Sequence, residues 1–221
     1  MYRLIFMHMP KCAGRSVKAL LNANYGSVLE VNNMNWLDKQ KSEDLVGFPL
    51  IMGHIQFCNI RRLIDHYRFI TILRDPLERT ISQYNHFMTK KTSVKEAKIM
   101  RDGNYSFIDF VSANDFRLEP WVNSYVTYLG ATGWTYNLLE FYQRAKLNIR
   151  KLDFIGIYEK LKESIEMMKE KYFLKGDLKT IGKTPENDKL VKLSASDEGL
   201  AKECLEPDYI LYEMAKRGMS L

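Results

Sequence analysis

The chain has 221 residues, 46% of them hydrophobic and 27% charged, which is a globular composition long enough to bury one substantial core. No run approaches the roughly 18 to 20 apolar residues of a membrane-spanning helix, and three cysteines without metal-ligand spacing support neither a disulfide framework nor a zinc site. The net charge of +6 favours anionic ligands, but the basic residues form no dense run with interleaved aromatic residues, so we expect no nucleic-acid partner.

The first predicted strand, residues 4–9, leads into a short cationic loop and then a helix. Gly14 lets the backbone approach a ligand closely, and Ser16 opens a helical pattern. N–H groups at the start of the helix and the side chains of Lys11, Arg15 and Lys18 would converge on one small volume. This junction predicts a site for a phosphate-type anion, although an ordinary turn with solvated basic residues has the same pattern.

Two further predicted strands are followed by residues that carry chemistry. Residues 48–53 form a short apolar segment that leaves His54 at the mouth of the next loop. Residues 69–73 give the strongest strand signal and are followed by Arg74. The loop ends of central strands are where α/β proteins place reactive groups. His54 is therefore a candidate reactive group, with a structural histidine as the alternative.

The helix after Arg74 is predicted from its cap and its periodicity. Asp75 suits the N-cap, and Pro76 suits the first helical position. Spacings of four, three and four residues place on its apolar face Leu77, Ile81, Tyr84 and Met88. The opposite face receives Arg79, Ser82 and His86. Arg74 and Ser82 could then hold one anion from two sides, whereas the alternative is a solvated helix face.

The rest of the chain continues the alternation of strands and helices. Helices are predicted at residues 107–111, 121–129, 138–147, 160–172 and 207–217, and strands at residues 28–31 and 153–159. This order predicts an α/β fold with a central, mainly parallel sheet flanked by helices. No internal repeat or low-complexity linker divides the chain, so we predict one domain over residues 1–221. The turn-rich segment 182–187 is either a surface turn or a loop that reaches back to the ligand.

Three blocks occur in a fixed order, namely residues 6–16, the pair Gly53-His54, and residues 73–84 with the pattern Arg-Asp-Pro to Ser-x-Tyr. Together they resemble the carbohydrate sulfotransferases related to heparan sulfate 2-O-sulfotransferase, which use 3′-phosphoadenosine 5′-phosphosulfate (PAPS). Residues 154–159 are similar to the downstream strand of that family. The resemblance implies a P-loop-like three-layer fold and a single sulfotransferase domain.

The resemblance also implies roles for individual residues. PAPS would be the co-substrate, and adenosine 3′,5′-bisphosphate (PAP) would be the product. No metal would be required. The cofactor-binding residues would be Lys11, Cys12, Ala13, Gly14, Arg15, Ser16, Arg74 and Ser82. Lys11 suits the phosphosulfate and its leaving oxygen, and Arg74 with Ser82 suits the 3′-phosphate. His54 would be the general base, because the pKa of histidine is near 6.5. The acceptor would be a hydroxyl, less readily an amine, of a saccharide or glycolipid.

The first block departs from the family pattern. After the lysine, the family usually has threonine, glycine or alanine, glycine, threonine and serine, whereas this chain has Cys12, Ala13, Gly14, Arg15 and Ser16. Arg15 either adds a phosphate contact or points to solvent. Cys12 raises the alternative of a cysteine phosphatase, but that chemistry needs an arginine where Lys18 stands.

Two other function classes compete with sulfate transfer. A P-loop nucleotide kinase or NTPase would need the spacing G-x-x-x-x-G-K-[ST], which is missing, and an acidic residue for Mg²⁺ where His54 stands. A non-catalytic glycan-binding module would use the basic surface alone. We expect no stable membrane insertion and a cytoplasmic enzyme of bacterial type, with a trimmed catalytic domain from the Golgi lumen as the alternative.

Overall fold

The computed structural model describes residues 2–32, 34–89, 92, 94–113, 115–132, 137–179, 181 and 191–219. Its strands are β1 (Leu4–Met7), β2 (Val28–Val31), β3 (Leu50–Gly53), β4 (Arg68–Leu73) and β5 (Phe154–Ile157). The helices of the first half are α1 (Gly14–Asn22), α2 (Met34–Lys39), α3 (Ser42–Val46), α4 (Phe57–Ile60), α5 (Pro76–Met88), α6 (Lys95–Asp102) and α7 (Phe107–Val111). Those of the second half are α8 (Glu119–Val122), α9 (Ser124–Gly130), α10 (Leu138–Asn148), α11 (Leu161–Tyr172), α12 (Ala195–Cys204) and α13 (Glu206–Met219).

The five strands form one parallel sheet in the order β2-β3-β1-β4-β5. β1 lies at its centre, with Ile5 paired to Ile51 of β3 on one side and to Phe69 of β4 on the other. Parallel neighbours need long crossover connections, and helices provide them here. The predicted α/β fold with a parallel sheet flanked by helices is therefore confirmed.

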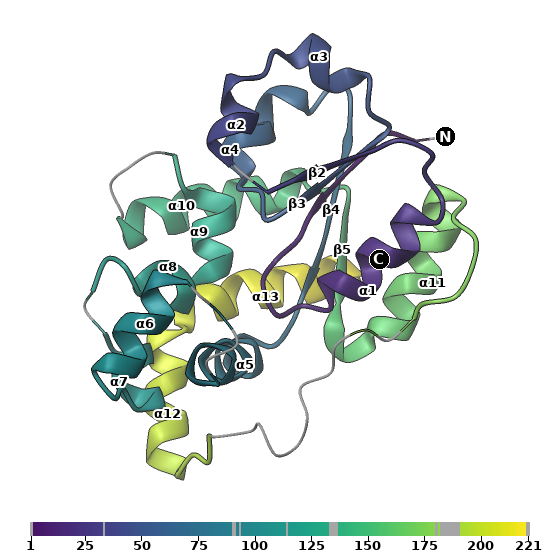
Figure 1. The fold of residues 1–221 in the computed structure, drawn as a ribbon. Helices are drawn as coiled ribbons and strands as arrows, with labels where there is room; N and C mark the ends of the chain where they lie inside the picture. Colours follow the sequence, from purple (N-terminus) through teal and green to yellow (C-terminus); the bar gives the residue numbers. More distant parts are fainter. Residues whose placement is uncertain are drawn as a thin grey trace.

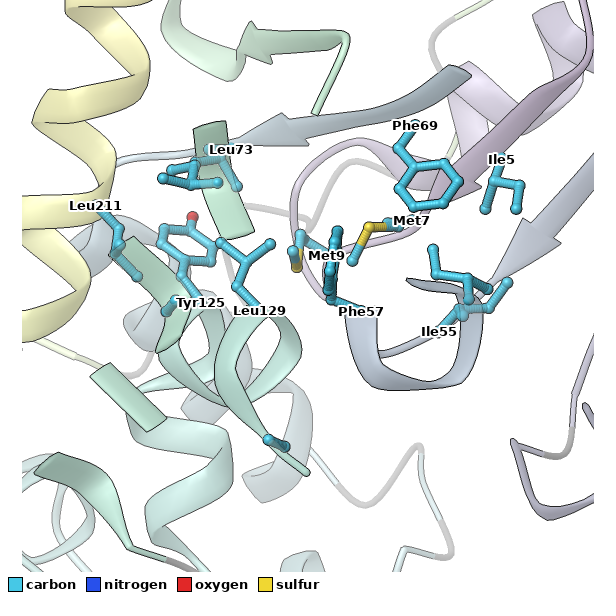
Figure 2. Close-up of a cluster of buried hydrophobic side chains, with 14 of the residues drawn as sticks. Ile5, Met7, Met9, Ile55, Phe57, Phe69, Leu73, Tyr125, Leu129 and Leu211 are labelled. Atoms are coloured by element: carbon cyan, nitrogen blue, oxygen red, sulfur yellow. The ribbon is translucent and has the colours of Figure 1, made fainter. Parts of the chain in front are cut away.

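Successive residues of the strands face two apolar cores, one on each side of the sheet. Ile5 and Met7 point into a core with α9, α10 and α13, and part of this core is drawn in Figure 2. Leu4 and Phe6 point into a second core with α1 and α11. Figure 1 shows α1 and α11 on one side of the sheet and α9, α10 and α13 on the other. The strands are continuous apolar runs because both faces of the sheet are covered.

A third apolar cluster lies beside the sheet, among α5, α6, α7, α8 and α12 (Figure 1). Leu77, Tyr84 and Phe87 are the contribution of α5. This helix begins as predicted, because the Asp75 carboxylate accepts a hydrogen bond from the Glu78 N–H at 3.0 Å. The cluster fixes α5, and with it the residues that follow β4.

The alternative of a solvated face opposite the apolar stripe of α5 does not hold at Arg79, which is completely buried. Its Nη2 donates to the carbonyl oxygens of Trp121 at 2.9 Å and Val122 at 2.5 Å. Its charge also stabilises the buried carboxylate of Asp208, whose pKa is nevertheless raised to about 6 by burial. Periodicity places Arg79 outside because it cannot foresee that α8 and α13 supply polar partners on that side of α5.

Element boundaries differ from the predictions in several places. The helix α1 begins at Gly14, two residues before the predicted start at Ser16. The sequence pattern does not predict α2, α3 or α12, which are short or weakly amphipathic. The segment 182–187 lies outside the described residues. Within the described part of the chain, no helix is both long and apolar enough to cross a membrane.

Candidate functional site

The candidate site lies at the carboxyl edge of the sheet, where the chain changes its direction of travel across the strands. From β1 the chain passes through α1 to β2 and returns to β3, whereas from β4 it continues to β5 on the opposite side. Open parallel sheets bind ligands at such a point. The loops that carry Lys11, His54 and Arg74 meet there, because β3, β1 and β4 are adjacent strands about 4.8 Å apart.

The loop between β1 and α1 has the backbone geometry of an anion-binding loop. Its φ angles are positive at Lys11 (66°) and Ala13 (57°), on either side of Cys12. Left-handed residues alternating with right-handed ones turn successive N–H groups toward one side and form a concavity for anions. Ala13 is the N-cap of α1 and offers no capping side chain, so the helix start at Gly14 presents its N–H groups to a ligand.

The side chain of His8 packs closely over Gly14. A Cβ atom at this position would lie 1.7 Å from Nε2 of His8. The space that the sequence suggests for a ligand over Gly14 is therefore filled by the imidazole of His8. The same imidazole stacks on that of His54, with ring centres 4.2 Å apart and planes inclined by 24°. His8 thus joins the anion-binding loop to His54.

Three cationic side chains gather at this loop. Partial burial lowers the pKa of Lys11, and repulsion from Arg15 and Arg74 lowers it further. Arg15 is the second residue of α1 and is exposed, and Arg74 comes from the separate loop after β4. The structure therefore brings Arg15 and Arg74 within electrostatic range of Lys11, as an anion site requires.

The side chain of Arg74 is half-buried and makes two contacts. Its guanidinium lies over the ring of Tyr158, 4.7 Å from the ring centre, and its Nη2 donates to the Glu78 carboxylate at 3.1 Å. Its Nε is buried and has no partner among the described residues. Ser82 is half-buried on α5, four residues after Glu78, so it lies on the side of this helix that faces Arg74.

His54 is oriented by the backbone of the anion-binding loop. Its Nδ1 lies 2.8 Å from the carbonyl oxygen of His8. A carbonyl oxygen can only accept, so Nδ1 carries the proton and Nε2 is left as a proton acceptor. Desolvation lowers the pKa of His54, and the nearby charge of Lys18 lowers it too. The hydrogen bond to His8 and the charge of Glu30 act in the opposite direction, but the pKa remains below its ordinary value. Burial and the neighbouring cations also lower the pKa of His8 to about 3. Both imidazoles are neutral at physiological pH.

Comparison with protein families connects this arrangement to a known activity. The family described as the sulfotransferase family matches residues 1–196. This chain belongs to the sulfotransferase family. The match includes the five strands of the sulfotransferase and all its candidate site residues, from Lys11 to Ser82. A search of curated proteins gave no match.

In this sulfotransferase Cys12 is a structural residue. It is buried, and its Sγ contacts the carbonyl oxygen of Pro10 at 3.4 Å and the hydroxyl of Tyr125 at 3.5 Å. Burial raises the pKa of the thiol to about 11, so the thiolate that a cysteine phosphatase needs does not form near neutral pH. Lys18, at the position of that enzyme's arginine, is paired with Glu30.

Ser16 differs from the other residues of the predicted set. Its N–H donates to the carbonyl oxygen of Ala13 at 3.0 Å, and its Oγ accepts a hydrogen bond from the N–H of Ile181 at 2.9 Å. Both polar groups of Ser16 are thus engaged within the sulfotransferase. Through this hydrogen bond, Ile181, which follows α11, contacts the start of α1.

Two residues that shape the sulfotransferase site were missed by sequence reasoning. The ring of Tyr158 packs against the guanidinium of Arg74, and the ring of His8 stacks on that of His54. Each follows the last residue of a strand, so the rule that indicates His54 and Arg74 could also have found them. Within the described ranges, no three side chains of His, Cys, Asp or Glu are grouped as a metal site.

Proposed function

We propose that this sulfotransferase transfers a sulfuryl group from PAPS to a hydroxyl group of a saccharide or glycolipid, with His54 as general base. The observation that carries the proposal is the closeness of the cations Arg15 and Arg74 to Lys11, together with an oriented His54 at the end of the neighbouring strand β3. Family membership supports sulfuryl transfer in general. The saccharide acceptor is supported by the resemblance of the three residue blocks to carbohydrate sulfotransferases.

The residues present fit a ligand with two phosphate groups. The buried Nε of Arg74 is a donor that costs free energy unless a ligand accepts its hydrogen bond. An anion beside Lys11 would also relieve the repulsion that lowers the pKa of this lysine. In the proposal, Arg74 and Ser82 hold the 3′-phosphate, and Lys11, Arg15 and the N–H groups at the start of α1 hold the 5′-phosphosulfate.

Each residue then has a defined task. PAPS, when bound, supplies an activated sulfuryl group on its phosphosulfate anhydride. Nε2 of His54 accepts the proton of the acceptor hydroxyl, while Nδ1–H stays bonded to the carbonyl oxygen of His8. The ammonium group of Lys11 stabilises the negative charge that develops on the bridging oxygen. The contribution of the protein is positioning and fixed positive charge.

A thermal-shift panel tests the proposal against the two alternative functions. PAP without a metal should raise the melting temperature by several degrees at about 100 times its Kd. Stabilisation by ATP with Mg²⁺ but not by PAP would favour a nucleotide kinase or NTPase, and stabilisation by neither would favour a glycan-binding module. A labelled-sulfate assay over a glycan panel, followed by mass spectrometry, then identifies the acceptor.

Replacing Arg74 with alanine should weaken PAP binding more than the binding of adenosine 5′-phosphate. Losing a hydrogen bond to a charged group costs about 1.5 to 3 kcal/mol, so the Kd for PAP should rise about 10- to 150-fold. Calorimetry with both ligands measures the difference. Arg68→Ala, at the opposite end of β4, removes the same side chain from an ion pair with Asp153 and should leave both affinities unchanged. Equal losses for the two ligands would show that Arg74 does not bind the 3′-phosphate.

A further inference from the structure

Tyr125 occupies a buried position between the two loops that carry the cations. It is completely buried in α9, and Figure 2 shows its hydroxyl oxygen pointing toward Leu73, the last residue of β4. This hydroxyl accepts a hydrogen bond from the N–H of Arg74 at 2.9 Å and donates one to the carbonyl oxygen of Arg74 at 2.6 Å. One side chain therefore satisfies both main-chain groups of the arginine that faces the anion site.

The same hydroxyl also reaches the anion-binding loop. The Sγ atom of Cys12 lies 3.5 Å from the hydroxyl oxygen of Tyr125. In the sequence, Cys12 stands between Lys11 and Ala13, the two residues with positive φ angles. The loops after β1 and after β4 are thus connected through a single oxygen atom. A shift of this atom would change the direction of the Arg74 backbone relative to Lys11.

Two buried charged residues hold Tyr125 in place. The carboxylate of Asp208, from α13, accepts hydrogen bonds from the N–H groups of Tyr125 at 3.1 Å and Val126 at 2.9 Å, and so caps the start of α9. The guanidinium of Arg79 lies 5.7 Å from the ring centre of Tyr125 and binds the last carbonyl oxygens of α8. Burying these charges is costly, which is consistent with a requirement for an accurately placed tyrosine.

We propose that Tyr125 is a positioning residue for the anion site. Its hydroxyl fixes the main chain of Arg74 relative to the anion-binding loop. The role of the site as a PAP-binding site rests on the proposed function, but the fixing of Arg74 does not. Tyr125 needs no contact with the ligand, because its effect is transmitted through the backbone of Arg74. A phenylalanine would keep the ring packing and leave two main-chain groups of Arg74 without their partner.

The variant Tyr125→Phe should therefore weaken PAP binding about tenfold, with a smaller change for adenosine 5′-phosphate. In a chain that already carries Arg74→Ala, the same substitution should have no further effect on PAP affinity, because residues that act through one another are not additive. Tyr67→Phe is the matched control, since the hydroxyl of the buried Tyr67 binds main-chain oxygens of Leu45 and Phe48 away from the site, and its loss should leave both affinities unchanged. Independent, additive losses would overturn the proposal, as would a lower melting temperature with an unchanged ratio of the two affinities.

Amide hydrogen exchange gives a readout that needs no ligand. In the unsubstituted chain the Arg74 amide should exchange as slowly as the amides inside β4, and Tyr125→Phe should accelerate it at least tenfold relative to those amides. If the variant does not fold, slow exchange at Arg74 in the unsubstituted chain still supports the inference, and fast exchange overturns it. If the chain binds no PAP, the proposed function fails while this experiment still decides the role of Tyr125.

Discussion

Replacing His54 with glutamine is expected to slow sulfate transfer about 100- to 10,000-fold, which is the usual contribution of a positioned general base. Glutamine keeps a polar side chain of similar length, but its amide cannot accept the proton of the acceptor hydroxyl. The Kd for PAP should change less than about twofold, because we assign His54 no phosphate contact. A labelled-sulfate assay and calorimetry on one preparation measure both quantities.

The control for this variant is His66→Gln, which makes the same exchange at an exposed histidine before β4 and should leave the rate unchanged. Near-normal turnover in His54→Gln would contradict the assignment of the base. The pH profile gives a second readout. The neutral imidazole is the active form and its pKa lies below the ordinary 6.5, so kcat/KM should be constant at neutral pH and fall as pH drops below 6.5. The variant should lack this fall.

Replacing Lys11 with methionine is expected to reduce kcat about 100- to 1,000-fold, the range observed when one group that stabilises a developing charge is removed. Methionine keeps most of the length of the side chain but removes the ammonium group. The effect on PAP affinity should be smaller, because Arg15, Arg74 and the N–H groups of the loop still hold the ligand. Rapid-quench kinetics, which isolate the transfer step, measure the change.

Lys39→Met, at the exposed end of α2, is the matched control and should have no effect on either quantity. A variant of Lys11 that loses PAP affinity and keeps its kcat would show that this lysine contributes only to binding. If PAP affinity and kcat fall to the same extent, Lys11 contacts a phosphate group that it binds equally well in the ground state and in the transition state.

Much of the fold could be predicted from local signals in the chain. The strands β1 and β4, predicted at residues 4–9 and 69–73 and found at Leu4–Met7 and Arg68–Leu73, are apolar runs because both faces of the sheet are covered, and such runs are visible in sequence. The start of α5 was also predictable, since Asp75 and Pro76 act through their nearest neighbours. Positions at strand ends identified Lys11, His54 and Arg74, because parallel strands bring their carboxyl ends to one edge.

What could not be predicted depends on partners distant in the sequence. Arg79 is polar and lies off the apolar stripe of α5, and its burial is explained by the carbonyl oxygens at the end of α8 and by Asp208 of the last helix. The contact between Cys12 and Tyr125 likewise joins residues 113 positions apart. Sequence reasoning recognised that Cys12 departs from the family pattern, but the tyrosine that explains it is not visible without the fold.

The packing of His8 against Gly14 and His54 has a consequence for how this site tolerates change. The backbone of α1, the two stacked rings and the strand end of β3 form one continuous column of contacts. A larger residue at position 14 must displace the ring of His8, and that displacement disturbs the stacking of His8 on His54. Positions 8 and 14 are therefore expected to be coupled under mutation, so that a larger residue at position 14 is best tolerated together with a smaller side chain at position 8.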